Sequence, residues 1–326
     1  MKVIVAGCDF RPRPHMVSWF AKAFRRLGCE VQVVSSEPDR GEIDDGSVDP
    51  QWEAPVRRAG PRDGGRPVAS SLGDCDLFVM IDCGNDWAVV NDGRFPYVYV
   101  WREGNPEEYP HVGGAANGAP VFCCMVEKGT PWPAGTQFMP FAVDRGLFAG
   151  GLPFHERPYA FCYTGRERGG VGATYPGWQQ AFGTLNRAVK CVAYIDFVEY
   201  QRILRSSLTT CVADSGRYVA SRGLEAMACG QVVFWDAPGP DGALARTGLV
   251  EGQDYLSCNH RIEGNEYIPV LDMERVAGVV SDHEAWEYIS GRAQRSVLGA
   301  HTYEHRAWTL AHAAGLALPL TVEELS

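Results

Sequence analysis

The chain has 326 residues, 45% of them hydrophobic and 21% charged, which is enough apolar material for two domains and too much for a disordered chain. Its formal net charge of -10 argues against a protein that coats nucleic acid through a broad basic surface. The first apolar run is too short for a signal peptide, and no stretch approaches the roughly 18 apolar residues of a membrane span, so a cytoplasmic protein is expected.

Eleven cysteines are scattered along the chain without a CxxC pair. Several lie inside apolar runs, such as VFCCMV at 121–126. Buried thiols in a reducing compartment are therefore expected, rather than disulfides or a metal site.

The N-terminal half alternates apolar runs with a helix-like segment. Strands are expected at 2–8, 31–34, 76–81, 97–101, 120–125 and 137–144. An amphipathic helix is expected at 16–27, ending at Gly28. The apolar runs are continuous rather than alternating, which suits parallel strands buried on both faces. Residues 37–71, rich in Pro, Gly, Asp and Arg, are expected to form a long surface excursion.

The alternation restarts after a Gly- and Pro-rich stretch at 145–158 that is expected to be a linker. Strands are expected at 159–165, 188–195, 208–214 and 231–236. A helix-like segment at 218–229 ends at Gly230. Two such alternations predict an α/β fold of two facing Rossmann-like domains, with ligands in a cleft at the carboxyl ends of the strands. The expected domains are 1–145 and 146–326, with a last helix that could pack back toward the first domain.

The segment SRGLEAMACGQVVFWDAPG at 221–239 carries the strongest local signal. It resembles the donor-binding core of group 1 glycosyltransferases of the GT-B fold, in particular the spore-maturation-protein-like branch, whose pattern reads R-x-x-E-A-x-A-C-G before a strand. The residues on that pattern are Arg222, Glu225, Ala226, Ala228, Cys229 and Gly230. Further segments agree with the family in order: PFAVDRGLF at 140–148, YTGR at 163–166, GLVEGQDYL at 248–256 and HTYEHRA at 301–307.

The resemblance implies a metal-independent glycosyltransferase, a hexosyl- or pentosyltransferase that needs no cofactor. Its substrates would be a nucleotide-sugar, with a UDP-sugar as the expected donor, and a hydroxyl-bearing acceptor. The resemblance assigns Glu225 to the ribose hydroxyls; the alternative is an ordinary solvated helix residue. A diphosphate also needs exposed N–H groups and positive charge, which Gly-containing turns at helix N-termini and arginines supply. The candidate donor-binding residues are Gly165, Arg166, Arg168, Ser215, Gly216, Arg217, Tyr218, Arg222 and Glu225.

One position departs from the family's pattern. Many retaining members carry a second glutamate eight residues before the ribose-binding one, and Arg217 stands there, so the stereochemistry stays open. An inverting enzyme would need a general base near the acceptor hydroxyl, on the N-terminal side of the cleft. The candidate bases, each of which could instead be a loop or capping residue, are Asp9, Asp82, Asp86, Glu103 and His111.

Three other functions compete with this interpretation. HTYEH at 301–305 matches the H-x-x-E-H pattern of inverted zinc peptidases, but no downstream acidic helix supplies a third ligand, which favours a structural helix. The first turn, AGCDFRPRP, lacks the G-x-G-x-x-G of a nicotinamide-dependent dehydrogenase. A non-catalytic two-domain small-molecule-binding protein would share the same fold.

The identity of the acceptor is left open by the sequence. A soluble or exposed hydroxyl is expected, with a hydroxymethylated base in DNA as the specific alternative. Basic and aromatic residues of the N-terminal half could line a groove for a polyanion and a displaced base, although the net acidity opposes this. They are Phe10, Arg11, Arg13, Trp19, Lys22, Trp52, Arg57, Arg58, Arg62 and Arg66.

Overall fold

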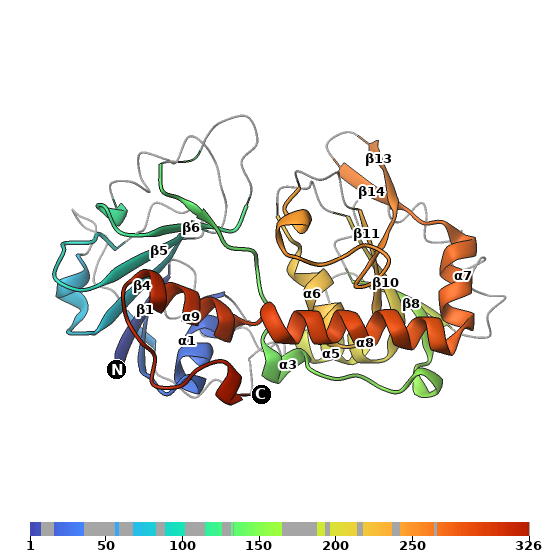
Figure 1. Ribbon diagram of the computed structural model, residues 1–326, viewed down its shortest axis with the longest axis horizontal. Helices are drawn as coiled ribbons and strands as arrows, with labels where there is room; N and C mark the ends of the chain where they lie inside the picture. The colour runs from blue at the N-terminus through green and yellow to red at the C-terminus, as the bar shows by residue number, and fades with distance from the viewer. Residues whose placement is uncertain are drawn as a thin grey trace. The chain divides into compact units, whose positions relative to one another are not determined.

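The computed structural model describes residues 1–7, 16–35, 56–58, 68–82, 89–101, 115–125, 132, 134–164, 188–192, 196–213, 218–236, 242–263 and 266–325 (Figure 1). The chain divides into two compact units. Unit 1 comprises Met1–Pro140 and Tyr303–Ser326, and unit 2 comprises Phe141–Thr302. The chain therefore crosses from one unit to the other twice.

Unit 1 is built on a sheet whose described strands follow the order β3-β2-β1-β4-β5-β6-β7. The strands are β1 Lys2–Gly7, β2 Glu30–Ser35, β3 Val56–Arg58, β4 Leu77–Asp82, β5 Tyr97–Trp101, β6 Val121–Cys123 and β7 Gln137–Phe138. Every neighbouring pair is parallel. The strand order reverses between β1 and β4, which is the switch point of a doubly wound sheet.

Two helices far apart in the sequence lie side by side in unit 1: α1 Met16–Arg26 and α9 Tyr303–Ala313 (Figure 1). Arg26 at the end of α1 donates a hydrogen bond of 2.6 Å to the buried carboxylate of Glu304 in α9. The fully buried ring of Tyr303 packs edge-on against Phe20 of α1, with 5.1 Å between the ring centroids. The last helix is thereby part of the core of unit 1.

Two elements overlap the stretch 37–71, which was expected to be a surface excursion. β3 adds a parallel strand beside β2, and the 3-10 turn η1 Ala69–Leu72 buries both of its terminal side chains. Ala69 and Leu72 join a core cluster that also holds Ile4. The expectation was wrong for these residues because short elements among many Pro and Gly residues leave no readable periodicity.

Unit 2 is built on a second sheet, with the order β12-β11-β10-β8-β9 in the described part of the chain. The strands are β8 Tyr159–Thr164, β9 Ala188–Val192, β10 Ser207–Ala213, β11 Val232–Asp236 and β12 Leu256–Ser257. They are all parallel. The order reverses between β8 and β10, so the switch point of this sheet lies between these two strands.

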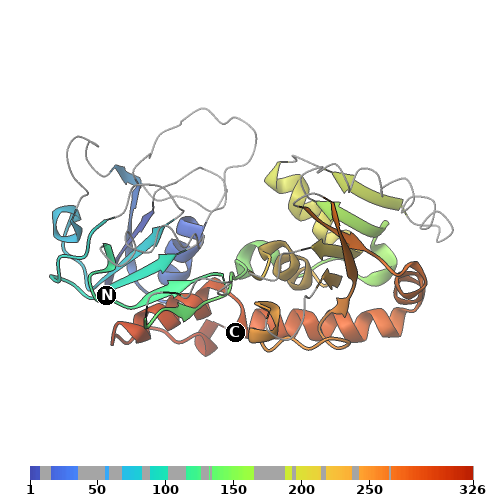
Figure 2. The same cartoon turned by 90° about the horizontal axis from the view of Figure 1, so that it is seen from above.

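The helices of unit 2 are α3 Arg145–Phe148, α5 Phe197–Arg205, α6 Ser221–Ala228, α7 Met273–Ser281 and α8 His283–Ala300. The long α8 runs along one side of the unit and packs on α6 and β11 (Figure 2). An antiparallel hairpin joins β13 Asn259–Glu263 to β14 Glu266–Val270. Besides η1, the described residues contain the 3-10 turns η3 Phe154–Glu156 and η5 Leu244–Arg246 in unit 2 and η6 Glu323–Leu325 in unit 1. Among the ranges given above, no helix has both the length and the apolar character needed to cross a bilayer.

The segment expected to be a linker, 145–158, is a packed part of unit 2. Phe148 is fully buried, and the Arg157 side chain is only 3% exposed. The Arg157 guanidinium donates hydrogen bonds to three backbone carbonyls, those of Leu152, Ser207 and Cys229. Burial lowers the pKa of Arg157 to about 10. The Gly and Pro content of this segment suggested a linker, but its few large side chains hold it against the unit.

The cysteines of the described ranges are free thiols, and six of them are buried. Burial raises the pKa of Cys29 and Cys75 to about 11 and that of Cys191 to about 12. These thiols stay protonated at neutral pH and act as small apolar side chains, as expected from the sequence.

Candidate functional site

The first turn of α6 lies at the switch point of unit 2. In a parallel sheet the carboxyl ends of the strands share one edge, and open α/β folds bind ligands there, where the strand order reverses. α6 is the helix after β10, and Arg222 in its first turn donates a hydrogen bond of 2.5 Å to the carbonyl of Thr164, the last residue of β8. Arg222 thus ties the start of α6 to the carboxyl end of the strand beyond the reversal.

Glu225 lies one turn further along α6 and is only 4% exposed. Its Oε2 accepts a hydrogen bond from the hydroxyl of Tyr200 in α5. Burial raises the pKa of Glu225 to about 7, while the bond from Tyr200 and the positive charge of Arg222 act in the opposite direction. The alternative of a solvated helix residue is therefore wrong for Glu225. A buried carboxyl that titrates near neutral pH is typical of functional sites.

Tyr200 is the member of this cluster that no sequence pattern identified. Burial and the negative charge of Glu225 raise the pKa of Tyr200 well above its usual range, so the phenol remains a hydrogen-bond donor. Its ring packs edge-on against Phe148 at 6.2 Å and lies 6.3 Å from the ring of Phe197. The signal available in the sequence was the amphipathic spacing of FVEYQRILR, which indicates a helix without indicating this partner.

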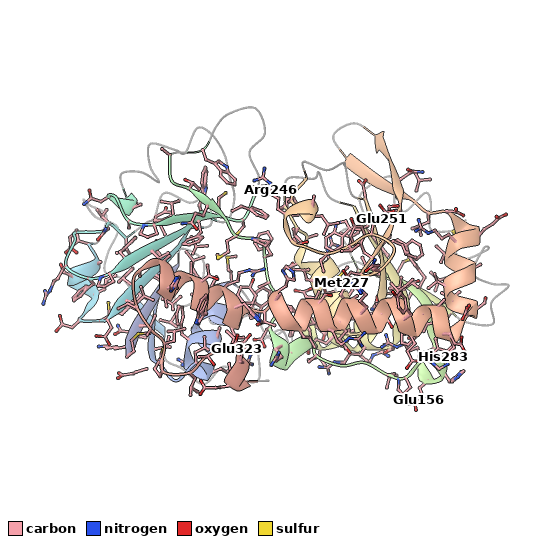
Figure 3. All side chains as sticks on the ribbon, viewed as in Figure 1. Glu156, Met227, Arg246, Glu251, His283 and Glu323 are labelled. Atoms are coloured by element: carbon pink, nitrogen blue, oxygen red, sulfur yellow. The ribbon has the colours of Figure 1, made fainter. Side chains whose placement is uncertain are left out.

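Gly223 lets α6 lie directly on the sheet. A Cβ atom at this position would stand 2.3 Å from two ring carbons of Trp235, a fully buried residue of β11. Real Cβ atoms do not approach other atoms so closely, so a larger residue would force α6 or the indole to move. Met227 on the same helix, labelled in Figure 3, is also fully buried. Glycine at position 223 therefore sets the depth at which Arg222 and Glu225 are held.

The third described donor candidate, Tyr218, stands just before α6. Its ring meets that of Phe141 edge-on, with 6.3 Å between the centroids. The structure brings Arg222 and Glu225 together on successive turns of one helix and places Tyr218 before its start. The other donor candidates lie outside the described residues: Gly165, Arg166, Arg168, Ser215, Gly216 and Arg217.

Among the candidate bases, Asp82 is the last residue of β4, at the carboxyl end of the strand next to the switch point of unit 1. The other candidate bases, Asp9, Asp86, Glu103 and His111, lie outside the described residues. Two residues expected to line a groove are engaged within unit 1: Lys22 is buried at 6% exposure, and the half-buried Trp19 packs its ring 5.1 Å from that of Tyr303. Both lie on α1, and Trp19 contacts α9 through Tyr303.

The HTYEH segment is divided between two helices. His301 is the C-cap of α8, and α9 begins only at Tyr303. Glu304 is engaged by Arg26. The two histidines therefore do not share a helix, and the glutamate already has a partner, so the arrangement of an inverted zinc peptidase is not formed. Within the described ranges, no group of three or more His, Cys, Asp or Glu side chains is arranged to hold a metal ion.

Residues 163–312 match a protein-family model described as "Glycosyl transferase-like". The matched segment begins at the end of β8 and runs through α5, α6 and α8 into α9. It therefore contains Tyr200, Arg222 and Glu225. A comparison with curated protein sequences finds no significant match.

Solved structures with similar folds cover almost the whole chain. An alpha-glucosyltransferase in complex with UDP and a 13-mer DNA containing an HMU base has a TM-score of 0.64 at 11% identity, over 97% of this chain and 99% of that chain. An alpha-glucosyltransferase with UDP-glucose and DNA containing an abasic site has a TM-score of 0.61 at 12% identity, over 94% and 95%. HepE of Anabaena in complex with UDP has a TM-score of 0.58 at 12% identity, over 97% and 100%. At such low identity the likeness concerns the fold.

Proposed function

We propose that this chain, a glycosyltransferase with the GT-B fold, transfers a sugar from a UDP-sugar to a hydroxyl acceptor. The observation that carries the choice of donor is the pair of Arg222 and Glu225 at the switch point of unit 2. A carboxylate held there can accept both hydroxyls of a ribose, and the similar structures named above contain UDP or UDP-glucose. The nucleotide-sugar is a substrate, and we propose no further cofactor. A cytoplasmic location suits the free, buried thiols.

In this proposal the diphosphate is neutralised by arginines and by helix N-termini rather than by a metal ion. Arg222 is exposed in the first turn of α6, where the positive end of the helix dipole adds to its charge. Gly165, Arg166, Arg168 and residues 215–217 remain candidates for the other phosphate contacts. During transfer the acceptor oxygen forms a bond to the anomeric carbon while the bond from that carbon to the UDP oxygen breaks, and the acceptor proton passes to a base.

An inverting transfer needs a general base within reach of the acceptor hydroxyl. Asp82, Asp9, Glu103 and His111 are the candidate bases for an inverting mechanism, which is considered because Arg217 stands where many retaining members of the pattern described above carry glutamate. Substituting each candidate by its amide or by alanine and measuring kcat at saturating donor would identify the base. The anomeric configuration of the product would decide between inversion and retention.

A ligand screen tests the donor assignment directly. UDP and the cognate UDP-sugar should raise the melting temperature, whereas GDP, ADP and NAD should not, because a ligand stabilises the folded state by an amount that grows with the logarithm of its concentration divided by its Kd. Glu225→Ala should weaken UDP binding about tenfold to a hundredfold, the worth of a charge-assisted hydrogen bond. Stabilisation by NAD would instead support a dehydrogenase, and UDP-sugar binding without release of UDP would support a non-catalytic receptor.

A hydroxymethylated base in DNA is the second candidate acceptor. The observation that favours it is the similarity of fold, over 94–97% of this chain, to alpha-glucosyltransferases in complex with DNA. The net charge of -10 opposes extended DNA binding, so any contact would need a local basic groove. Duplex DNA with and without hydroxymethylated pyrimidine should be offered together with small hydroxyl acceptors, and transfer followed by mass spectrometry. If DNA receives no sugar and does not bind at low salt, this acceptor is wrong and the glycosyltransferase assignment still stands.

A further inference from the structure

We propose that Tyr200 is a positioning residue of the donor site, which orients the carboxylate of Glu225 so that this site binds nucleotides with an intact ribose and discriminates against 2′-deoxyribose. The inference rests on the donor site proposed above. Tyr200 donates its hydroxyl hydrogen to Oε2 of Glu225 across the contact between α5 and α6. One carboxylate oxygen is thereby fixed from the protein side, which leaves Oε1 to accept hydrogen bonds from the nucleotide.

The Tyr200 ring is held by its surroundings, so its hydroxyl has a defined position. Phe148 of α3 and Phe197 of α5 pack against the ring. α5 is anchored to α3 because the side chains of Gln201 and Arg205 both donate to the carbonyl of Leu147, at 2.7 and 2.8 Å. A carboxylate oriented by a rigid aromatic hydroxyl loses little conformational freedom when a ligand binds, which favours tight binding.

The charge on Glu225 is sensitive to this contact. Burial raises the pKa of Glu225, and the Tyr200 hydroxyl and Arg222 are the two groups that lower it. Cys229, at the end of α6, stays neutral because burial raises its pKa to about 12, and Arg145 of the neighbouring α3 donates to a backbone carbonyl of α8. Removing the Tyr200 hydroxyl should therefore raise the pKa of Glu225 further, so that, as the pH falls, the carboxylate becomes protonated at a higher pH than in wild type.

Discrimination between ribose and deoxyribose follows from the same geometry. An ionised carboxylate accepts hydrogen bonds from both the 2′ and the 3′ hydroxyl, whereas 2′-deoxyribose offers only one of them. Binding removes water from the Glu225 carboxylate, and two ribose hydroxyls replace that water. The deoxy analogue supplies one hydroxyl and leaves part of the carboxylate unpaired, so it binds less tightly. The wild-type protein should therefore bind UDP about tenfold more tightly than dUDP.

The test compares Tyr200→Phe with wild type by titration calorimetry, using UDP and dUDP between pH 5.5 and 8.5. Phenylalanine keeps the ring against Phe148 and Phe197, so the fold should be retained, as a melting curve will check. We expect about tenfold weaker UDP binding, a smaller preference for UDP over dUDP, and a pH midpoint of UDP binding that moves upward. Tyr288→Phe, at an exposed position of α8, is the matched control and should leave all three quantities unchanged.

A double-mutant cycle that combines Tyr200→Phe with Glu225→Gln gives a second measurement, the coupling between the two residues in UDP binding. This coupling does not depend on the stability of Tyr200→Phe alone. The effects of the two substitutions on UDP affinity should not add, because both act through one hydrogen bond. Unchanged selectivity and an unchanged pH midpoint in Tyr200→Phe would overturn the inference while leaving the donor site in place. If wild type binds no uridine nucleotide at any pH, the proposed function fails, and the inference fails with it.

Discussion

Adding one methyl group at Gly223 should separate the steric requirement of α6 from the ordinary preference of helices for alanine. In Gly223→Ala the new Cβ would lie 2.3 Å from Cη2 and Cζ3 of Trp235 and 3.0 Å from Cε3. Ordinary carbon contacts begin near 3.5 Å, so helix and ring must separate by about 1 Å. Trp235 is fully buried and cannot turn toward solvent.

The expected cost follows from two opposing contributions. Overpacking a buried contact costs about 1 to 3 kcal/mol, whereas replacing glycine by alanine inside a helix gains about 1 kcal/mol. Gly278→Ala in α7 provides the second contribution alone, because a Cβ there meets no atom within 4 Å. Gly278→Ala should therefore be slightly more stable than wild type, and Gly223→Ala should be less stable than Gly278→Ala by about 2 kcal/mol.

Urea unfolding of the three proteins measures this difference, and UDP titration measures its consequence for the site. Gly223→Ala should also bind UDP more weakly, since a displaced α6 carries Arg222 and Glu225 with it. Shortening the opposing side chain in a Trp235→Leu background should reduce the penalty of the added methyl group. Equal stability changes in the two glycine variants would refute the reasoning that a contact with Trp235 requires the glycine.

Three further predictions concern metal dependence, pH and an anchoring arginine. Turnover should survive EDTA, and an activity lost in EDTA and restored by manganese would contradict metal independence. Folding raises the pKa of Glu225 from 4.5 to about 7, so the contribution of its protonated form to stability is present at low pH and lost as the pH rises. Between pH 4.5 and 8.5, the free energy of unfolding of wild type, measured in urea, should fall by about 3 kcal/mol relative to that of Glu225→Gln. A difference between the two proteins that does not change with pH would refute this. Arg157→Met should lower the free energy of unfolding by about 3 kcal/mol or more, because it leaves the buried carbonyls of Ser207 and Cys229 and the partly buried carbonyl of Leu152 without their donor. Arg202→Met, which removes an exposed ion pair with Glu199, should cost less than about 1 kcal/mol. Equal costs would show that the buried contacts of Arg157 matter less than their geometry suggests.

The sequence predicted the elements whose signal is local. β5 occupies the expected residues, 97–101, because a continuous run of aromatic and branched side chains is read directly as a buried strand. α6 begins three residues later than expected, since Ala220 is extended and serves as its N-cap. β7 ends at Phe138 rather than continuing to 144, just before Pro140, which has no N–H to donate to the sheet.

Features that depend on distant partners could not be predicted. The hydrogen bond between Tyr200 and Glu225 joins two helices separated by a strand, and nothing in either helix sequence specifies the other. The burial of Lys22 likewise depends on how α1 is covered in the folded unit. The R-x-x-E motif could be recognised because Arg222 and Glu225 lie three residues apart in one short helix.

The return of residues 303–326 to unit 1 has a consequence for the order of folding during synthesis. Helix α1 buries Phe20 against Tyr303, and the carbonyl of Leu27 accepts a hydrogen bond from the backbone N–H of Leu320. These partners are synthesised after unit 2, so the N-terminal part of unit 1 emerges first but its core is completed only once residues 303–326 have been made. Unit 2, contiguous from Phe141 to Thr302, has all of its contacts available earlier. We therefore expect nascent chains that stop near residue 302 to carry a protease-resistant unit 2 beside a protease-sensitive unit 1.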